Sequence, residues 1–231
     1  MKKILTILTT ASMVMALVSC DKNDHECPIC ETIEQEVKKM PSKVTQHRPI
    51  PIDIEYFYDV HRRLVKIVQG GSSWVDITYN SDNAPIKLEM MWDTDIIYQD
   101  HGKKITILRD TFWLNDEGQF IKWYRNMSSS TIEFTYNSDG NIIKWYYPST
   151  GQEINFSYSD ALPIFRYVNV PEWFLFWLHT ANALVYPFEK KGYLPSGTDN
   201  QISYELDVDN YAIRIKNSDA LTHEYEYILI Q

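Results

Sequence analysis

Two closely spaced cysteines are the residues whose type and spacing most directly suggest chemistry. Cys27 and Cys30 enclose Pro28-Ile29 in a C-x-x-C motif. Such a pair can exchange electrons at the mouth of a βαβ unit, or supply two of the roughly four ligands of a structural zinc site, for which His25 is the neighbouring candidate. No βαβ pattern follows the motif. We therefore expect a local disulfide, as is usual in an oxidising compartment, with zinc binding and redox catalysis as alternatives.

Cys20 stands at the end of an export signal. Two lysines precede an uncharged, mostly apolar stretch at 4–18, and the small residue Ser19 comes directly before the cysteine. Leu17-Val18-Ser19-Cys20 resembles the lipobox, which implies cleavage after Ser19 and acylation of Cys20, for example with palmitate. The alternatives are an ordinary signal peptide or a retained transmembrane helix, but the apolar run is short for a span of about 20 residues.

The composition restricts the partners of the mature chain. The formal net charge is −9 for the full sequence and −11 without residues 1–19, which contain only the charges of Lys2 and Lys3. Phosphate binding needs clustered Lys and Arg, so nucleic acid is not expected as a partner. The polar stretch 21–26 resembles, imperfectly, the surface-export signals of Bacteroidota lipoproteins. We expect a lipid-anchored protein of the outer membrane, with the leaflet left open.

No catalytic motif is evident. None of the six histidines belongs to an H-E-x-x-H pair, Gly70-Gly71-Ser72 is not a nucleophile elbow, and no phosphate-binding loop or dinucleotide fingerprint is present. Carboxylate pairs can hydrolyse glycosides, and one acidic cluster invites that role: Asp93, Asp95, Asp100 and Asp110. A solvated acidic loop is the favoured interpretation, so no enzyme, cofactor or metal site is expected.

An internal repeat determines the predicted fold. Each copy contains a basic residue flanked on both sides by apolar residues, which predicts a strand whose basic side chain faces water. Apolar residues also recur eight, ten and twelve positions earlier, and Asp110 alone interrupts the twelfth-position column. The six basic markers are Lys66, Lys87, Lys122, Lys144, Arg166 and Arg214.

Turn-forming residues lie between the two halves of most copies. Asn115-Asp116-Glu117-Gly118 and 137–141 (Asn-Ser-Asp-Gly-Asn) are examples, and such residues tolerate positive φ and bond to their own backbone. Each copy is therefore predicted to be a β-hairpin of about twenty-two residues. The expected fold is mainly β, an antiparallel, open curved or rolled sheet of about six repeated hairpins.

Two insertions interrupt the repeat. Residues 91–104 predict an extra strand or an extended hairpin, with a turn at 100–103. Residues 171–186 predict a helix that is apolar nearly all round and hence buried, within an insertion at about 168–200. The expected organisation is a signal peptide at 1–19, a tether at 20–53 with a lipidated N-terminus, and a hairpin-repeat domain at 54–231.

The segment 136–145, YNSDGNIIKW, resembles the YD-type repeat of Rhs-like proteins. With the lipobox and the sequence KGYLPS at 191–196, the chain is similar to a family of Bacteroidota lipoproteins of unknown function. The resemblance covers roughly 54–231 and implies an extracytoplasmic β-rich repeat domain, without catalytic residues to carry over. The first turn, Asp59-Val60-His61, and the glycine-free 160–163 depart from the pattern.

Seven tryptophans suggest binding rather than catalysis. Trp123 and Trp145 share the column of apolar residues after the marker and are expected in the core, whereas Trp74, Trp92 and Trp113 fall outside the inward columns. Exposed indoles stack on sugar rings or bind protein partners. The leading hypothesis is a non-enzymatic module that binds a glycan or a protein at the cell envelope; the alternatives are a structural accessory of an envelope complex and, less favoured, a hydrolase.

Overall fold

A computed structural model describes residues 37–91, 93–158, 161–180, 195–196, 202–217 and 220–230. The strands before the helix α1 (Glu172–Leu178) are β1 (Lys39–Gln46), β2 (Ile52–Tyr58), β3 (Leu64–Gln69), β4 (Ser72–Tyr79), β5 (Pro85–Glu89), β6 (Asp93–Gln99), β7 (Lys104–Ile107), β8 (Asp110–Leu114), β9 (Phe120–Arg125), β10 (Ser130–Tyr136), β11 (Ile142–Tyr147), β12 (Gln152–Asn155) and β13 (Ser157–Tyr158). Those after it are β14 (Pro195–Ser196), β15 (Ile202–Leu206), β16 (Ala212–Asn217) and β17 (Ala220–Leu229). Short 3-10 turns occupy Asp100–Gly102 and Asn126–Ser128.

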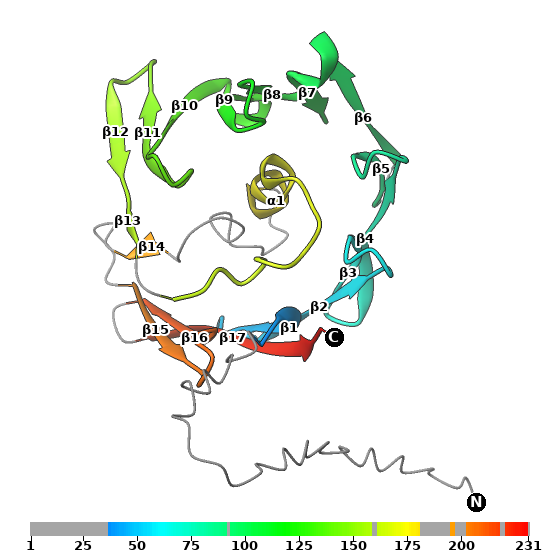
Figure 1. Ribbon diagram of the computed structural model, residues 1–231, viewed down its shortest axis with the longest axis vertical. Helices are drawn as coiled ribbons and strands as arrows, with labels where there is room; N and C mark the ends of the chain where they lie inside the picture. Colours follow the sequence, from blue (N-terminus) through cyan, green and yellow to red (C-terminus); the bar gives the residue numbers. More distant parts are fainter. Residues whose placement is uncertain are drawn as a thin grey trace, which may run out of the picture. The chain divides into compact units, whose positions relative to one another are not determined.

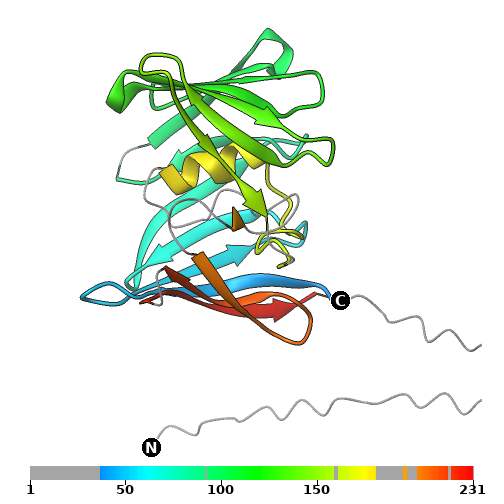
Figure 2. The same ribbon diagram turned by 90° about the vertical axis from the view of Figure 1, so that its left-hand side faces the viewer.

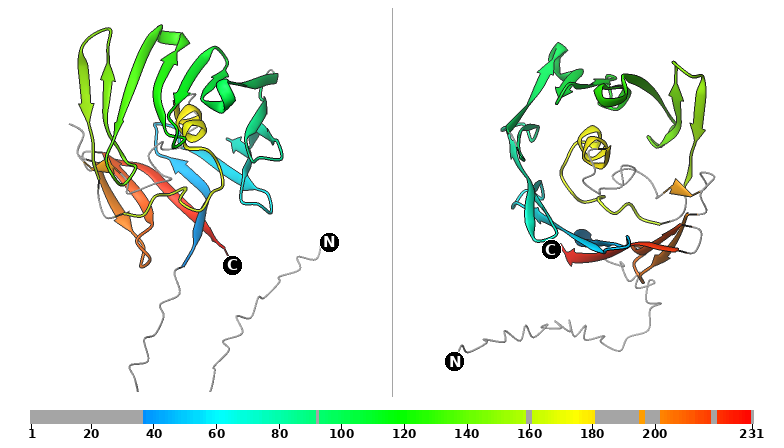
Figure 3. Two further views of the ribbon diagram at one scale, coloured as in Figure 1. Left: turned by 45° about the horizontal axis from the view of Figure 1, so that its top comes forward. Right: turned by 180° about the vertical axis from the view of Figure 1, so that it is seen from behind.

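The predicted fold class is confirmed: one antiparallel sheet of fifteen strands carries the fold. The strands β1 to β12 follow one another as a meander, and β17, β16 and β15 continue the sheet beyond β1. The sheet curls around α1, as Figures 1 and 3 show in end-on views and Figure 2 from the side. Its two edge strands, β12 and β15, do not pair with each other, so the sheet remains open. The short strands β13 and β14 pair separately.

Five hairpins share one turn geometry. In the turn at 137–141, the backbone N–H of Asn137 donates to the carbonyl of Asn141, and the Asn137 side-chain oxygen accepts from the N–H groups of Asp139 and Asn141. The fourth turn residue, Gly140, has a φ of +81°, which a residue without Cβ adopts at little cost. The equivalent turns are 59–63, 80–84, 115–119 and 207–211. The first turn, which departs from the pattern in sequence, therefore keeps its geometry, with Arg62 at the positive-φ position.

A β-bulge follows each of these turns, and it corrects the simple alternation predicted from the sequence. In β10–β11, Tyr136 pairs with Ile142 and Thr135 with Lys144, which leaves Ile143 as the extra residue. The residue before each basic marker is thus displaced from the inner face: Ile86 and Ile121 are 36% and 40% exposed. The residue two before the marker is buried instead. Bulges bend and twist a strand, so five bulges in the same phase favour a sheet that curls.

Six tyrosines form hydrogen bonds across boundaries between repeat units. The hydroxyl of Tyr136, eight positions before a marker, donates to the backbone carbonyl of Phe120 at 2.9 Å, next to the bulge of the preceding hairpin. Burial raises the pKa of the Tyr136 phenol above its ordinary value, which keeps it a donor. Equivalent bonds join Tyr58 to Pro41, Tyr79 to Leu64, Tyr98 to Pro85, Tyr158 to Ile142 and Tyr227 to Ala212.

Replacing Tyr136 by phenylalanine is expected to lower the free energy of unfolding by about 1 kcal/mol, because a partly buried carbonyl loses its donor while the ring remains. Urea denaturation followed by circular dichroism measures the change. Tyr124→Phe is the matched control: Tyr124 lies on the neighbouring strand β9, and no hydrogen bond of its hydroxyl is found among the described residues. Equal losses in both variants would contradict the structural role of the Tyr136 bond.

The strands β17 and β1 form a further repeat unit that is divided between the two ends of the domain. Tyr227 pairs with Pro41 and Glu226 with Lys43, so Ser42 is the bulge residue and Lys43 takes the marker position. The predicted tether at 20–53 is therefore too long, because the sheet begins at Lys39 rather than at Ile54. The pairing partner of β1 comes from the far end of the chain, which a local pattern does not reveal.

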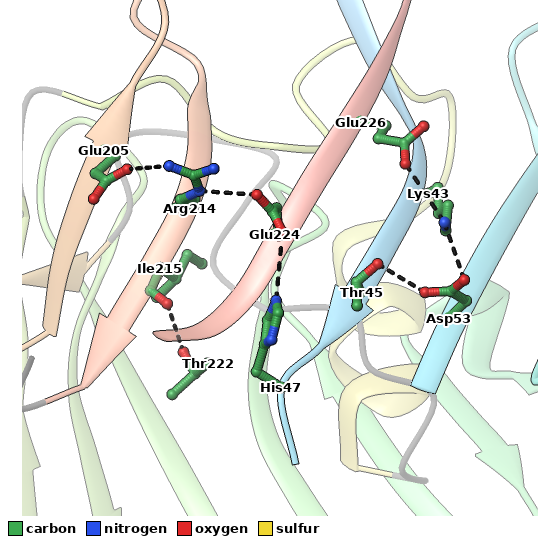
Figure 4. A network of polar contacts seen from close by, with 10 residues as sticks. All are labelled: Lys43, Thr45, His47, Asp53, Glu205, Arg214, Ile215, Thr222, Glu224 and Glu226. Atoms are coloured by element: carbon green, nitrogen blue, oxygen red, sulfur yellow. Dashed lines mark hydrogen bonds and ion pairs between the residues drawn. The ribbon is translucent and has the colours of Figure 1, made fainter. Parts of the chain in front are cut away.

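Ion pairs on the outer face accompany this junction. Arg214 on β16 bonds Glu205 on β15 and Glu224 on β17, while Lys43 on β1 reaches Glu226 on β17 and Asp53 on β2 (Figure 4). Hydrogen bonding from Arg214 holds the pKa of the Glu224 carboxyl below its usual range. Such exposed pairs contribute little stability individually, but they fix the register in which the two ends of the domain meet.

One of the six predicted hairpins, the one with Arg166 as its marker, does not form. Residues 164–167 are a turn, and Leu162 makes an isolated parallel bridge to Tyr211. The segment lacks the Asn/Asp-x-x-Gly turn, and Pro163 has no N–H to donate to a strand partner. Its apolar side chains pack into the interior instead, with Ile164 and Phe165 fully buried.

The interior is filled by α1, as predicted. Pro171 precedes the helix, and every helical residue from Trp173 to Leu178 is buried. The α-helix covers Glu172–Leu178, residues 179–180 continue in π-helical geometry, and the remainder of the helix predicted to 186 lies outside the described residues. The extended hairpin predicted as one alternative for the first insertion is confirmed as β6 and β7, with its turn at Asp100–Gly102.

Candidate functional site: two cavities at the end of the sheet away from the repeated turns

The inner face of the sheet carries unusual residue pairs at its end remote from the five turns. In the regular unit β2–β3, this position holds Ile54 opposite Gln69. In the divided unit, Gln46 on β1 lies opposite His223 on β17. In β8–β9, Asp110 and Arg125 are the residues that flank the last registered pair, Thr111–Tyr124. In these two units His223 and Asp110 therefore occupy the position of the apolar Ile54, and Gln46 and Arg125 occupy the position of Gln69.

A cavity of about 430 Å³, a size typical of small-molecule sites, lies against Gln46, His223 and Arg125. Four aromatic side chains form part of its wall: Trp123, Trp145, Tyr147 and Phe176. The remaining described lining residues are Gln46, Arg48, Arg125, Ile132, His179, Thr180 and His223. The wall thus combines ring faces, which can pack against a ligand, with side chains that can bond to it.

Gln46 is the most informative of these side chains. It is only 5% exposed, and its Nε2 lies 3.0 Å from Nε2 of His223, while its Oε1 has no hydrogen-bond partner among the described residues. A buried acceptor without a partner is costly and uncommon in folded proteins. Gln46 is one of the residues that line the cavity, although its Oε1 is itself buried. A ligand that reached this oxygen with a hydrogen-bond donor would remove the cost.

His223 holds the Gln46 amide in place. Burial lowers the pKa of the His223 imidazole to about 4, and the positive charge of Arg48 and the neighbouring His179 and His47 act in the same direction. The ring is therefore neutral near pH 7, with Nε2 accepting from Gln46. Its Nδ1 lies 3.1 Å from Oγ1 of Thr222 and donates to it, and the Thr222 hydroxyl in turn donates to the carbonyl of Ile215 (Figure 4).

A second cavity, of about 410 Å³, adjoins the first and shares Arg125 and Thr180 with it. Asp110 lies in its wall, and burial raises the pKa of this carboxyl, while the backbone N–H of Asn126 and the charge of Arg125 oppose the rise. The rim includes the turn Leu108-Arg109, whose φ values of +48° and +77° are unusual for residues with side chains. Such backbone strain often accompanies functional sites.

The described lining residues of the two cavities offer aromatic rings, amide and hydroxyl groups, imidazoles, arginines and one carboxylate. Among their described lining residues, Asp110 is the single carboxylate, whereas glycoside hydrolysis uses two carboxylates on either side of the bond. The other acidic residues of the sequence cluster lie elsewhere: Asp93, Asp95 and Asp100 are exposed. Within the described part of the chain, no group of three or more His, Cys, Asp or Glu side chains is arranged to hold a metal ion.

The tryptophans predicted to bind a ligand are not brought together. Trp74 lies on β4 and Trp113 on β8, four strands apart and both half-buried. Trp113 packs beneath the ammonium group of Lys122, 5.5 Å from the ring centroid. Trp92, like Cys20, Cys27 and Cys30, lies outside the described residues.

Two features of the sequence point to the cavities in retrospect. Asp110 is the one interruption of an otherwise apolar column, and its inward position makes it part of the site. Arg125 stands three residues after the marker Lys122, where other units have Gln69, Met90 or Tyr147. Departures from the repeat, rather than the repeat itself, therefore mark the candidate site. Trp123 and Trp145, predicted to be core residues, do pack in the core, and they also face the first cavity.

Comparisons with known proteins assign no family. No family model matches the chain, and no curated protein matches it significantly. A porin-like protein from Bacteroides uniformis is similar in structure, with 14% identity and a TM-score of 0.37 over 82% of this chain and 98% of that one. A likeness this weak supports no conclusion about activity. In the described residues, no helix has the length and apolarity needed to cross a membrane.

Proposed function

We propose that this chain is a lipid-anchored envelope protein that binds a small polyhydroxylated ligand, such as a glycan, in the cavities at the end of its sheet, and that it does so without catalysis. The observation that carries this proposal is the buried, unpartnered Oε1 of Gln46 in the wall of an aromatic-lined cavity. Sugar rings offer both hydroxyl donors for such an acceptor and apolar faces for aromatic rings.

The anchor rests on the lipobox at Cys20. If the proposal is right, palmitate fed to the producing cells will be incorporated into the wild-type protein. Cell fractionation will then find that protein in the membrane fraction. Cys20→Ala is expected to lose the label and the membrane association, while Cys27→Ala keeps both. A soluble, unlabelled wild-type protein would contradict the anchor without bearing on the cavities.

Ligand binding is tested by titrating the purified full-length protein in detergent with a panel of neutral and acidic mono- and oligosaccharides, using calorimetry and tryptophan fluorescence. Trp123 and Trp145 line the first cavity, so binding there is expected to change the emission. Gln46→Met, which keeps the side-chain volume, should weaken binding at least tenfold and change the free energy of unfolding by less than about 1 kcal/mol.

The matched control separates the cavities from the outer face. Trp113→Ala removes an indole that the sequence favours as a ligand contact but that lies outside the described linings of both cavities. We expect unchanged affinity in this variant. Loss of binding in Trp113→Ala but not in Gln46→Met would move the site to the outer face, and no binding by the folded wild-type protein would favour the accessory role instead.

A further inference from the structure

Three arginines surround the two cavities without an acidic partner. Arg48 lines the first, Arg109 the second, and Arg125 both. In the described part of the chain, no carboxylate oxygen lies within 4 Å of any of the three. Most other basic side chains do have such partners, including Lys39, Lys43, Lys66, Lys87, Arg63, Lys144, Arg214 and Lys216.

This arrangement opposes the charge of the chain as a whole. The protein carries a formal net charge of −9, yet its described cavity walls hold three arginines and one carboxylate, Asp110. A concave site lined by one sign of charge attracts ligands of the opposite sign. Because none of the three guanidinium groups forms an ion pair in the described part of the chain, their concentration at the cavities points to a role in binding.

Arg125 is positioned for a planar anion. Its guanidinium lies over the ring of Trp123, 5.7 Å from the centroid, and this cation–π contact restricts the otherwise mobile side chain. A guanidinium presents its N–H groups in a fixed fork that matches the two oxygens of a carboxylate. Arg125 also belongs to both cavities, so an anionic group bound to it can extend a ligand into either.

We infer that the ligand of these cavities is an acidic sugar, a polyhydroxylated ring that carries a carboxylate. This inference rests on the proposed function. The carboxylate of the sugar accepts hydrogen bonds from Arg125, and the charge of Arg48 or Arg109 adds to the attraction. A ring hydroxyl donates to Oε1 of Gln46. The apolar face of the sugar ring packs on the aromatic wall that includes Trp145.

The test compares sugars that differ only at C6: galactose with galacturonic acid and glucose with glucuronic acid, as monomers and dimers. Titrations use the full-length protein in detergent at 50 mM NaCl. The acidic member of at least one pair is expected to bind at least tenfold tighter, and the difference should shrink at 500 mM NaCl because salt screens the charges. Arg125→Gln should abolish the preference, because it weakens binding of the acidic sugar much more than binding of the neutral one, whereas Arg125→Lys should retain part of the preference.

Arg62→Gly is the matched control. It removes one exposed arginine charge at a turn position with a φ of +61°, where glycine is favourable and where the equivalent turns have Gly118 and Gly140. The acid preference should persist in this variant. If Arg125→Gln does not fold, Arg48→Ala is the replacement variant, because Arg48 is exposed and its loss should not disturb folding. Arg48→Ala should reduce the preference for the acidic sugar.

The outcomes separate the inference from the proposed function. Equal affinity for the acidic and neutral members of every pair would overturn the inference and leave sugar binding intact. The inference also fails if the preference survives in both Arg125→Gln and Arg48→Ala, or is lost equally in Arg62→Gly. Failure of the folded protein to bind any sugar would overturn both.

Discussion

Replacing Phe176 by alanine is expected to lower the free energy of unfolding by about 3–5 kcal/mol, the usual cost of removing a fully buried aromatic ring. Phe176 is completely buried at the centre of the curled sheet. Its ring lies 5.0–5.6 Å, centroid to centroid, from the rings of Phe120, Trp123, Phe134 and Trp145. The variant loses the transfer free energy of the ring and leaves a cavity that strands fixed by hydrogen bonds cannot close.

Urea denaturation followed by circular dichroism gives the change in stability. Single domains have a free energy of unfolding of about 5–15 kcal/mol, so Phe176→Ala should be marginally folded at 37 °C. Met127→Ala is the control, because Met127 is 89% exposed and its loss should change stability by less than about 0.5 kcal/mol. A loss below about 1 kcal/mol in Phe176→Ala would contradict the placement of α1 inside the sheet.

Acidification is expected to destabilise the protein through His223. The folded-state pKa of about 4 lies below the unfolded value of 6.5, so the unfolded chain binds the proton more readily and stability falls as the pH drops through this window. Between pH 7 and pH 5 the loss from this one group amounts to about 2 kcal/mol. Protonation would also turn Nε2 of His223 into a donor facing the Nε2 donor of Gln46, which removes their hydrogen bond.

The measurement is the difference in the free energy of unfolding between pH 7 and pH 5 for the wild type and for His223→Gln. This range lies above the pKa of the paired carboxylates, such as Glu224, whose own loss of stability begins at lower pH. The variant should lose about 2 kcal/mol less than the wild type on acidification. Parallel stability curves for the two proteins would show that His223 is not buried in its neutral form.

Acid should also affect binding, because the Gln46 amide is held by the neutral imidazole. Sugar affinity is therefore expected to fall as His223 is protonated, in the same direction as stability. The acid preference attributed to Arg125 should not disappear with it, since the guanidinium remains charged throughout. The two cavities thus offer separable readouts: the pH dependence reports Gln46 and His223, and the salt dependence reports the arginines.

The sequence by itself determined the β class, the hairpin unit and the buried helix. Two-residue alternation and Asn/Asp/Gly turns are local properties, so 137–141 specifies its hairpin without knowledge of distant residues. A stretch from Trp173 to Leu178 without a polar face must be buried wherever the chain places it. The predictions that depended on these local rules agree with the structure.

Only the tertiary structure decided the features that join distant segments. The bulge before Lys144 changes which side chain faces inward, and no alternation rule contains it. The pairing of β1 with β17 depends on bringing Lys39–Gln46 and Ala220–Leu229 together from opposite ends of the domain. That same long-range pairing places Gln46 beside His223, and Arg125 on β9 lines the two cavities together with Phe176 and Trp177 of α1. The cavities exist because non-local contacts assemble them. In the sequence, their residues are distinguished only by departing from the repeat.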